Sequence, residues 1–181
     1  MDRSLVAAAV LALAGCQSES YLDPAGPGEA RTVGGICPVV YRVLDIPVPN
    51  SDARIYLNAF GKNEVAREAA IFLVVSDSGV FINNVWRGDP HPQRHVHKIS
   101  FPDGMTLQVT FDDGRTVSGE LATVSDGARG TTALILKLVL PDREVSRFSV
   151  VFPSVMVDGE RVGVGRVDFK PARATIYGIN C

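Results

Sequence analysis

The residues with the most evident chemical potential are the three histidines of the chain, which all lie in one stretch, Asp89-Pro90-His91-Pro92-Gln93-Arg94-His95-Val96-His97. If a strand begins at His95, His95 and His97 point to the same face, with side chains about 7 Å apart. Two imidazoles at this spacing are near the reach needed to share a Zn or Cu ion, and His91 or Asp89 could complete the site from the loop. The stretch therefore predicts a candidate metal site at His91, His95 and His97.

Two other interpretations fit the same stretch. Arg87, Arg94 and Lys98 flank the histidines and would repel a cation, and neither Cys nor Met joins them. A solvated edge strand is the favoured interpretation, because edge strands often carry charged side chains and nearby prolines that resist pairing with other chains. The third interpretation is recognition of an anionic group by the basic side chains Arg94, His95, His97 and Lys98.

A second candidate site comes directly before the histidines, at Trp86 and Arg87. An exposed Trp beside an Arg is the composition of a binding hot spot, whereas a Trp at a strand end more often anchors the packing of a sheet. Trp86, Arg87 and Arg94 are the candidate binding residues, because they lie in the most polar and turn-rich part of the chain.

Known catalytic motifs do not occur in the sequence, which contains no Gly-x-Ser-x-Gly, His-Glu-x-x-His or Gly-x-x-x-x-Gly-Lys. Asp112 and Asp113 are adjacent acids, but their place before Gly114 explains them as turn residues. The formal net charge of -2 offers no broad basic surface for nucleic acid. We therefore expect a protein that is not an enzyme, has no nucleic-acid partner, and binds no cofactor other than the candidate Zn or Cu.

The most specific motif lies at the N-terminus. An apolar block from Leu5 to Ala14 follows Arg3, and it is shorter than the about 20 residues of a membrane-spanning helix. The block ends in Leu13-Ala14-Gly15-Cys16, directly before a polar segment. Met1 to Cys16 resembles the signal peptide of bacterial lipoproteins, in which the chain is cut before the cysteine of such a lipobox and that cysteine receives acyl chains.

This resemblance implies that residues 1–15 are removed as a signal peptide and that Cys16 is lipidated, for example with palmitate. Each buried methylene contributes about 0.8 kcal/mol to membrane binding, so several chains exceed the marginal hold of a single one. In lipoproteins of Gram-negative bacteria an Asp after the cysteine usually signals retention at the inner membrane, and this chain has Gln17 there. We therefore expect lipid anchoring at the periplasmic face of the outer membrane.

Two cysteines remain after Cys16, namely Cys37 and Cys181 at the last position. In the oxidising periplasm an even number of cysteines predicts a disulfide. Closing so long a loop could stabilise the fold by about 4 to 5 kcal/mol in the chain-entropy model. Two free, buried thiols are the alternative.

The remaining chain divides into a tether and one domain. Residues 16–35 are polar and rich in Pro and Gly, which predicts a flexible tether because such a segment has little to bury. Residues 36–181 are predicted to form the domain, because short runs of Val, Ile, Leu, Phe and Thr recur there between turn signals. The predicted strands are Ile36–Ile46, Ala53–Phe60, Ala70–Ser76, Val80–Trp86, His95–Phe101, Met105–Phe111, Thr116–Val124, Thr131–Leu140, Phe148–Phe152, Val155–Val157, Val162–Phe169 and Thr175–Ile179.

Many strands with little helix predict an all-β domain, an antiparallel β-sandwich of Ig-like or transthyretin-like topology. Only Asn63 to Ala70 favours a helical turn. Asp113-Gly114 and Asp158-Gly159 are hairpin signals, because Gly accepts the positive φ that tight turns require.

A lipid-anchored β-sandwich is similar in layout to the small lipoprotein of type VI secretion membrane complexes and to periplasmic inhibitor or immunity lipoproteins. This similarity implies a binding or structural module of the cell envelope, attached to the membrane through its lipid, whose partner is another envelope protein. The alternative function is periplasmic metal binding at His91, His95 and His97.

Overall fold

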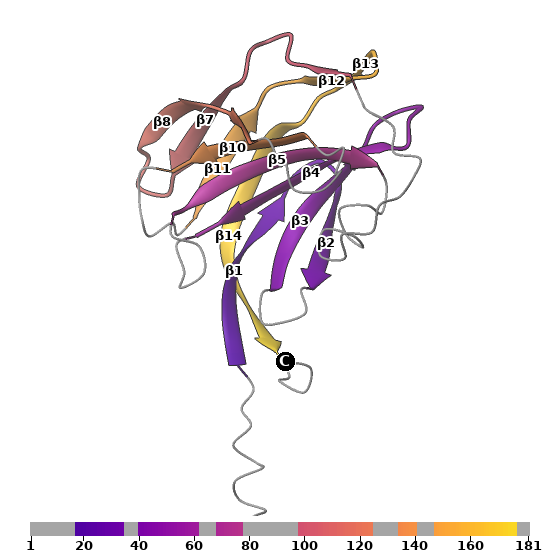
Figure 1. Ribbon diagram of the computed structural model, residues 1–181. Helices are drawn as coiled ribbons and strands as arrows, with labels where there is room; N and C mark the ends of the chain where they lie inside the picture. Colours follow the sequence, from indigo (N-terminus) through magenta and orange to yellow (C-terminus); the bar gives the residue numbers. More distant parts are fainter. Residues whose placement is uncertain are drawn as a thin grey trace, which may run out of the picture.

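The computed structural model of the 181-residue chain describes residues 17–34, 40–61, 68–77, 98–124, 134–140 and 147–176. The regular secondary structure within these ranges consists of strands, and every strand pair is antiparallel. The strands form packed sheets, so the domain is the all-β sandwich that the sequence predicts (Figure 1). Its finer assignment to an Ig-like or transthyretin-like topology stays a prediction.

The first layer is a five-stranded sheet with the order β1-β14-β11-β7-β8. Its buried face carries Val109, Val150 and Val167, whereas Gln108, Val151 and Arg166 on the other face are exposed. This alternation is typical of an antiparallel sheet with one solvated side, which we call the outer face. The strands of this sheet are β1 (Gln17–Ala25), β7 (Thr106–Phe111), β8 (Thr116–Glu120), β11 (Phe148–Phe152) and β14 (Gly165–Ile176).

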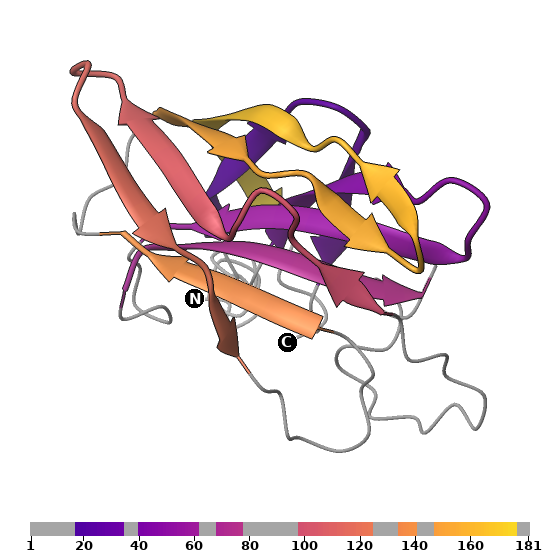
Figure 2. The same ribbon diagram turned by 90° about the horizontal axis from the view of Figure 1, so that it is seen from above.

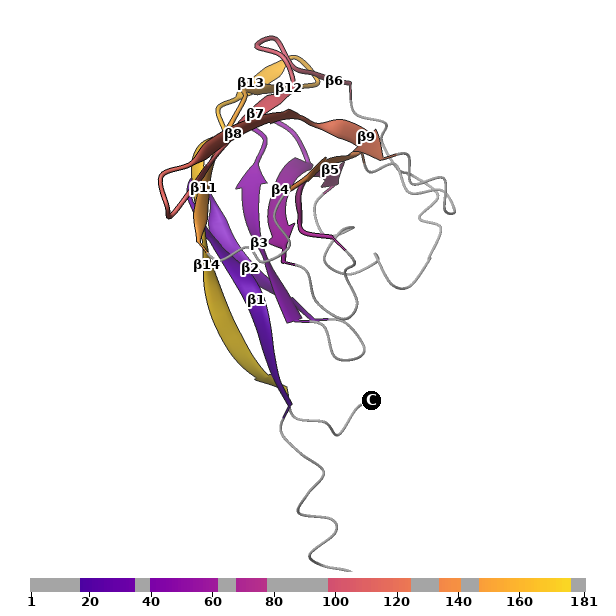
Figure 3. The same ribbon diagram turned by 90° about the vertical axis from the view of Figure 1, so that its left-hand side faces the viewer.

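The second layer is a six-stranded sheet with the order β2-β3-β4-β5-β10-β9. Leu44, Leu57, Leu73 and Leu136 lie in register across four of its strands, and all four are buried. This row faces the first layer, and Figures 2 and 3 show the two layers side by side. The strands are β2 (Glu29–Gly34), β3 (Val40–Pro47), β4 (Ala53–Phe60), β5 (Ala70–Asp77), β9 (Ala122–Val124) and β10 (Leu134–Val139).

Aromatic rings from the first layer fill the space between the sheets. The rings of Phe148 and Phe169 stack with centroids 5.0 Å apart, and the Phe111 ring lies 6.2 Å from that of Phe148. Because Phe148 and Phe169 are fully buried, they fix the faces of β11 and β14. Their chain neighbours must therefore point to the outer face.

A small third sheet closes one end of the core. It has the order β13-β12-β6 and consists of β6 (Ile99–Ser100), β12 (Val155–Val157) and β13 (Glu160–Val162). Val155, Val157 and Val162 are buried against the main core. In Figures 1 and 3 this sheet lies at the top of the molecule, far from the start of β1 and the end of β14 at the bottom.

The largest difference from the sequence-based prediction concerns residues 17–34, for which the sequence predicts a flexible tether. That prediction is wrong, because β1 pairs with β14 over its whole length, from Gln17 opposite Ile176 to Ala25 opposite Asp168, and β2 pairs with β3. The polar composition is compatible with strands because β1 and β2 are each the edge of a sheet. Residues 17–34 therefore belong to the folded domain, which the sequence predicts to start only near Ile36.

The Pro- and Gly-rich residues between β1 and β2 form the connection that takes the chain from one layer to the other. Gly28 has a φ of 106° there, and a Cβ atom on it would lie 2.5 Å from the backbone oxygen of Asp45. A glycine is therefore required for both the backbone conformation and the close approach to β3.

We expect Gly28→Ala to lower the free energy of unfolding by about 3 kcal/mol, because backbone strain and overpacking act together. Gly104→Ala is the matched control, since Gly104 also has a positive φ, of 84°, but no atom within 4 Å of an added Cβ. The control should lose only about 1 kcal/mol. Urea unfolding of both variants measures the difference, and equal losses would contradict a role for the contact with β3.

Candidate functional site

The residues that the sequence singles out lie outside the described ranges. They are Cys16, Cys37, Trp86, Arg87, His91, Arg94, His95, His97 and Cys181. The lipidation, the disulfide, the hot spot and the metal site therefore stay predictions, as do the expected strand Val80–Trp86 and most of the expected helical turn. Among the residues that are described, no group of three or more His, Cys, Asp or Glu side chains could hold a metal ion.

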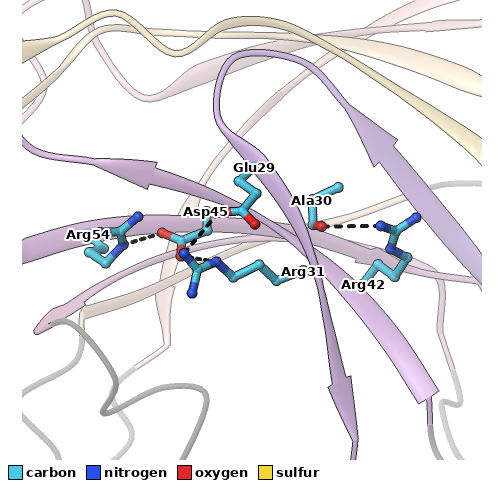
Figure 4. A network of polar contacts seen from close by, with 6 residues as sticks. All are labelled: Glu29, Ala30, Arg31, Arg42, Asp45 and Arg54. Atoms are coloured by element: carbon cyan, nitrogen blue, oxygen red, sulfur yellow. Dashed lines mark hydrogen bonds and ion pairs between the residues drawn. The ribbon is translucent and has the colours of Figure 1, made fainter.

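The described part contains one extended polar network, on the six-stranded sheet (Figure 4). Asp45 of β3 is at its centre, and only 1% of its side chain is exposed. Leu44 and Ile46 on either side of Asp45 belong to the core, so the carboxylate points to the opposite face of the sheet. Arg54 on β4 donates a hydrogen bond to Asp45 Oδ1, and Arg31 on β2 places its Nε 3.0 Å from Oδ2 as an ion pair.

This network continues toward the edge of the sheet. Arg31 also pairs with the exposed Glu29, with Nη2 and Oε2 2.9 Å apart. Nearby, Arg42 donates to the carbonyl oxygen of Ala30 at 3.1 Å (Figure 4). Arg42 also donates to Asp23 of β1 at 2.9 Å, which links β3 to both edge strands. These contacts explain why residues 17–34 are held as strands.

The charges around Asp45 balance. Arg31 and Arg54 face the carboxylates of Asp45 and Glu29. The hydrogen bond to Asp45 raises the pKa of Arg54 above its usual value, so this guanidinium stays charged. Because both cations already have carboxylate partners, the network is a structural clamp on β2, β3 and β4 rather than a ligand site.

A different feature lies on the outer face of the five-stranded sheet, where a hollow of about 460 Å³ opens to solvent. We call it the outer-face basin. Its lining combines polar and charged residues with the buried residues Phe111, Phe148 and Phe169. It is lined by Ala25, Thr110, Phe111, Asp112, Arg147, Phe148, Ser149, Arg166, Asp168, Phe169 and Lys170.

Short side chains make the floor of the basin. Ala25, Ser149 and Thr110 lie in one row across the sheet, because Asp168 of β14 is opposite Ala25 and Ser149, and Ser149 is opposite Thr110. Longer side chains at neighbouring positions rise around this row. The hollow therefore follows from the size of the side chains on an otherwise regular sheet.

The charged residues at the rim differ in their partners. Arg166 and Asp168 neutralise each other, with Nε and Oδ1 3.0 Å apart. Arg147 and Lys170 form no ion pair among the residues that the structure describes. Arg147 directly precedes Phe148 and Lys170 directly follows Phe169, and Phe148 is opposite Phe169 across β11 and β14, so both cations lie beside the same end of this strand pair. Like charges near each other on neighbouring strands are unfavourable.

The sequence-based reasoning missed the basin because its residues come from four strands that are far apart along the chain. A local signal did exist in β14, where Arg166, Asp168 and Lys170 alternate with the buried Val167 and Phe169. This alternation predicts one charged face, but it does not reveal which side chains of other strands lie beside it. Strand order and register were needed for that.

Comparison with known proteins does not assign the chain to a family. No protein-family model matches the chain, and neither the curated proteins nor the solved structures contain a significant match.

Proposed function

We propose that this protein is a non-enzymatic binding or structural module of the bacterial cell envelope, anchored by acyl chains on Cys16 to the periplasmic face of the outer membrane. Its proposed partner is another envelope component. The observation that carries the proposal is the direct succession of the lipobox, which ends at Cys16, and strand β1, which begins at Gln17.

The arrangement of β1 supports this proposal. Gln17 is opposite Ile176, so the start of β1 is held in a two-stranded ribbon with β14. In Figure 1 this ribbon end lies at the bottom of the molecule, opposite β12 and β13. Among the β1 residues whose burial is described, which are residues 20–25, Leu22 is the first that belongs to the core. An acyl anchor on Cys16, directly before Gln17, would thus be separated from the core by only the first residues of the ribbon that β1 and β14 form.

The outer face of the five-stranded sheet is the proposed binding surface. It carries the basin and also Val151, one of two large apolar residues that the described ranges leave strongly exposed, at 47%. The other is Val139 on β10 of the second sheet, at 48%. A polar, hollowed face with an apolar residue beside it is a suitable surface for recognition.

Two measurements test the proposal. Mass spectrometry of protein from the native cell should find an N-terminus at an acylated Cys16, and an intact Met1 would contradict the anchor. A photo-crosslinking amino acid at Val151 should capture an envelope protein in cells, whereas the equally exposed Val139 serves as the matched control. Equal capture at both positions, or capture at neither, would contradict the assignment of the outer face.

A further inference from the structure

We propose that the outer-face basin binds a phosphate monoester group, held by Arg147, Lys170 and the hydroxyl groups of Ser149 and Thr110. This inference rests on the proposed function, because it names the ligand class of the proposed binding surface. It does not depend on the lipid anchor.

The charge distribution is the first argument. Arg147 and Lys170 are both exposed, flank the paired residues Phe148 and Phe169, and form no ion pair among the described residues. Asp23, which is opposite Lys170 on β1, pairs with Arg42 of the other layer instead. An anion between the two cations would reduce their mutual repulsion and would pair with positive charge that the described part of the chain does not neutralise.

The donors at the floor are the second argument. Ser149 directly follows Phe148, so its hydroxyl lies on the outer face between the rows of Arg147 and Val151. Thr116 Oγ1 lies 3.1 Å from Thr110 Oγ1, so Thr116 can donate to Thr110 and leave the Thr110 proton for a ligand. The guanidinium of Arg147, the ammonium group of Lys170 and the two hydroxyl groups together offer hydrogen-bond donors from several sides of the basin.

The acidic residues of the basin narrow the choice of anion. Asp168 is neutralised by Arg166, but Asp112 also lines the basin, and its N–H donates to the carbonyl oxygen of Arg147 at 3.2 Å. A nearby carboxylate repels any anion, so the ligand must gain enough from the two cations and the hydroxyl groups to offset that repulsion. A phosphate monoester carries about 1.5 to 2 negative charges at pH 7 and three strong acceptor oxygens, so it gains more from the two cations and the hydroxyls than a carboxylate does.

The experiment uses the full chain in neutral detergent micelles. In one arm, glycerol 3-phosphate is titrated calorimetrically as a soluble phosphate monoester, with acetate as the monoanion for comparison. In the other arm, phosphatidic acid or phosphatidylcholine is added to the micelles and thermal unfolding is followed. Binding in the first arm identifies a soluble ligand, and binding confined to the second identifies a lipid headgroup.

The decisive variant is Arg147→Gln/Lys170→Gln, and its matched control is Arg161→Gln/Arg173→Gln, which removes two exposed cations outside the basin. We expect phosphate affinity to fall about tenfold in the first variant and to stay unchanged in the control. Equal affinities in the two variants, equal binding of acetate and phosphate, or no binding in either arm would overturn the inference. If capture at Val151 nevertheless succeeds, only the ligand class is wrong and the binding module stands.

Discussion

Replacing Cys16 with Ser is expected to remove the protein almost completely from the outer-membrane fraction. Serine cannot receive the thioether-linked lipid, and each lost methylene costs about 0.8 kcal/mol of membrane binding. Several acyl chains would hold the protein far more tightly than a single chain, so we expect the outer-membrane-bound amount to fall by roughly a hundredfold or more. Separation of inner and outer membranes on a density gradient, followed by immunoblotting, measures this.

The matched control is the same substitution at Cys37, which lies outside the lipobox. Cys37→Ser should leave the protein in the outer-membrane fraction, even if it lowers stability by removing the predicted disulfide with Cys181. Release of both variants, or of neither, would contradict lipidation at Cys16 as the source of membrane attachment.

The second large effect is expected at the centre of the polar network. Asp45→Ala should lower the free energy of unfolding by about 3 kcal/mol, because it removes the buried carboxylate and leaves the Arg54 and Arg31 guanidiniums without that partner. The side chain of Arg54 is only 22% exposed, so water compensates for little of this loss. Chemical denaturation of the purified variant measures the change.

Glu29→Gln is the control within the same network. Glu29 also contacts Arg31, but its side chain is 69% exposed, so the loss of this ion pair should cost about 0.5 kcal/mol or less. A similar destabilisation by both substitutions would show that the burial of Asp45 does not determine the strength of the clamp.

Much of the fold could be predicted from local sequence patterns. The predicted bounds of β4, β11 and β12 agree with the structure, because each strand is a short apolar run between turn signals. The hairpin signal at Asp158-Gly159 is confirmed, since both residues have positive φ between β12 and β13. Local chemistry determined these elements, and no long-range information was needed.

Other elements depended on pairing that a single sequence does not display. Two strands are predicted from Val162 to Ile179, but the structure has the continuous β14, which contains Pro171. Beyond Phe169, β14 pairs only with β1 in the described part. Pro171 therefore lies where β14 is an edge strand, which is where a sheet tolerates a residue without a backbone N–H. Similarly, the predicted strand Thr116–Val124 divides into β8 and β9, which belong to different sheets.

The residues 17–34 show why composition misled the prediction. Pro, Gly, Ser and Glu are typical of a flexible segment, but they are also tolerated in edge strands whose pairing is provided by β14 and β3. The Asp45 network and the outer-face basin were not predictable for a related reason. Each combines side chains from strands that are distant in the sequence, and only the order of the strands in the sheet reveals that these side chains are neighbours.

The pairing of Gln17 with Ile176 determines how far the domain could reach from the proposed anchor. A flexible chain of about 19 residues would let the domain explore a root-mean-square radius of about 24 Å around the attachment point. A strand instead holds Ala25, at the basin, about 26 Å from Gln17, from eight steps of 3.3 Å per residue. With the proposed acyl anchor on Cys16, a ligand or partner would therefore meet the basin within a narrow range of distances from the attachment point, rather than throughout the volume that a flexible chain explores.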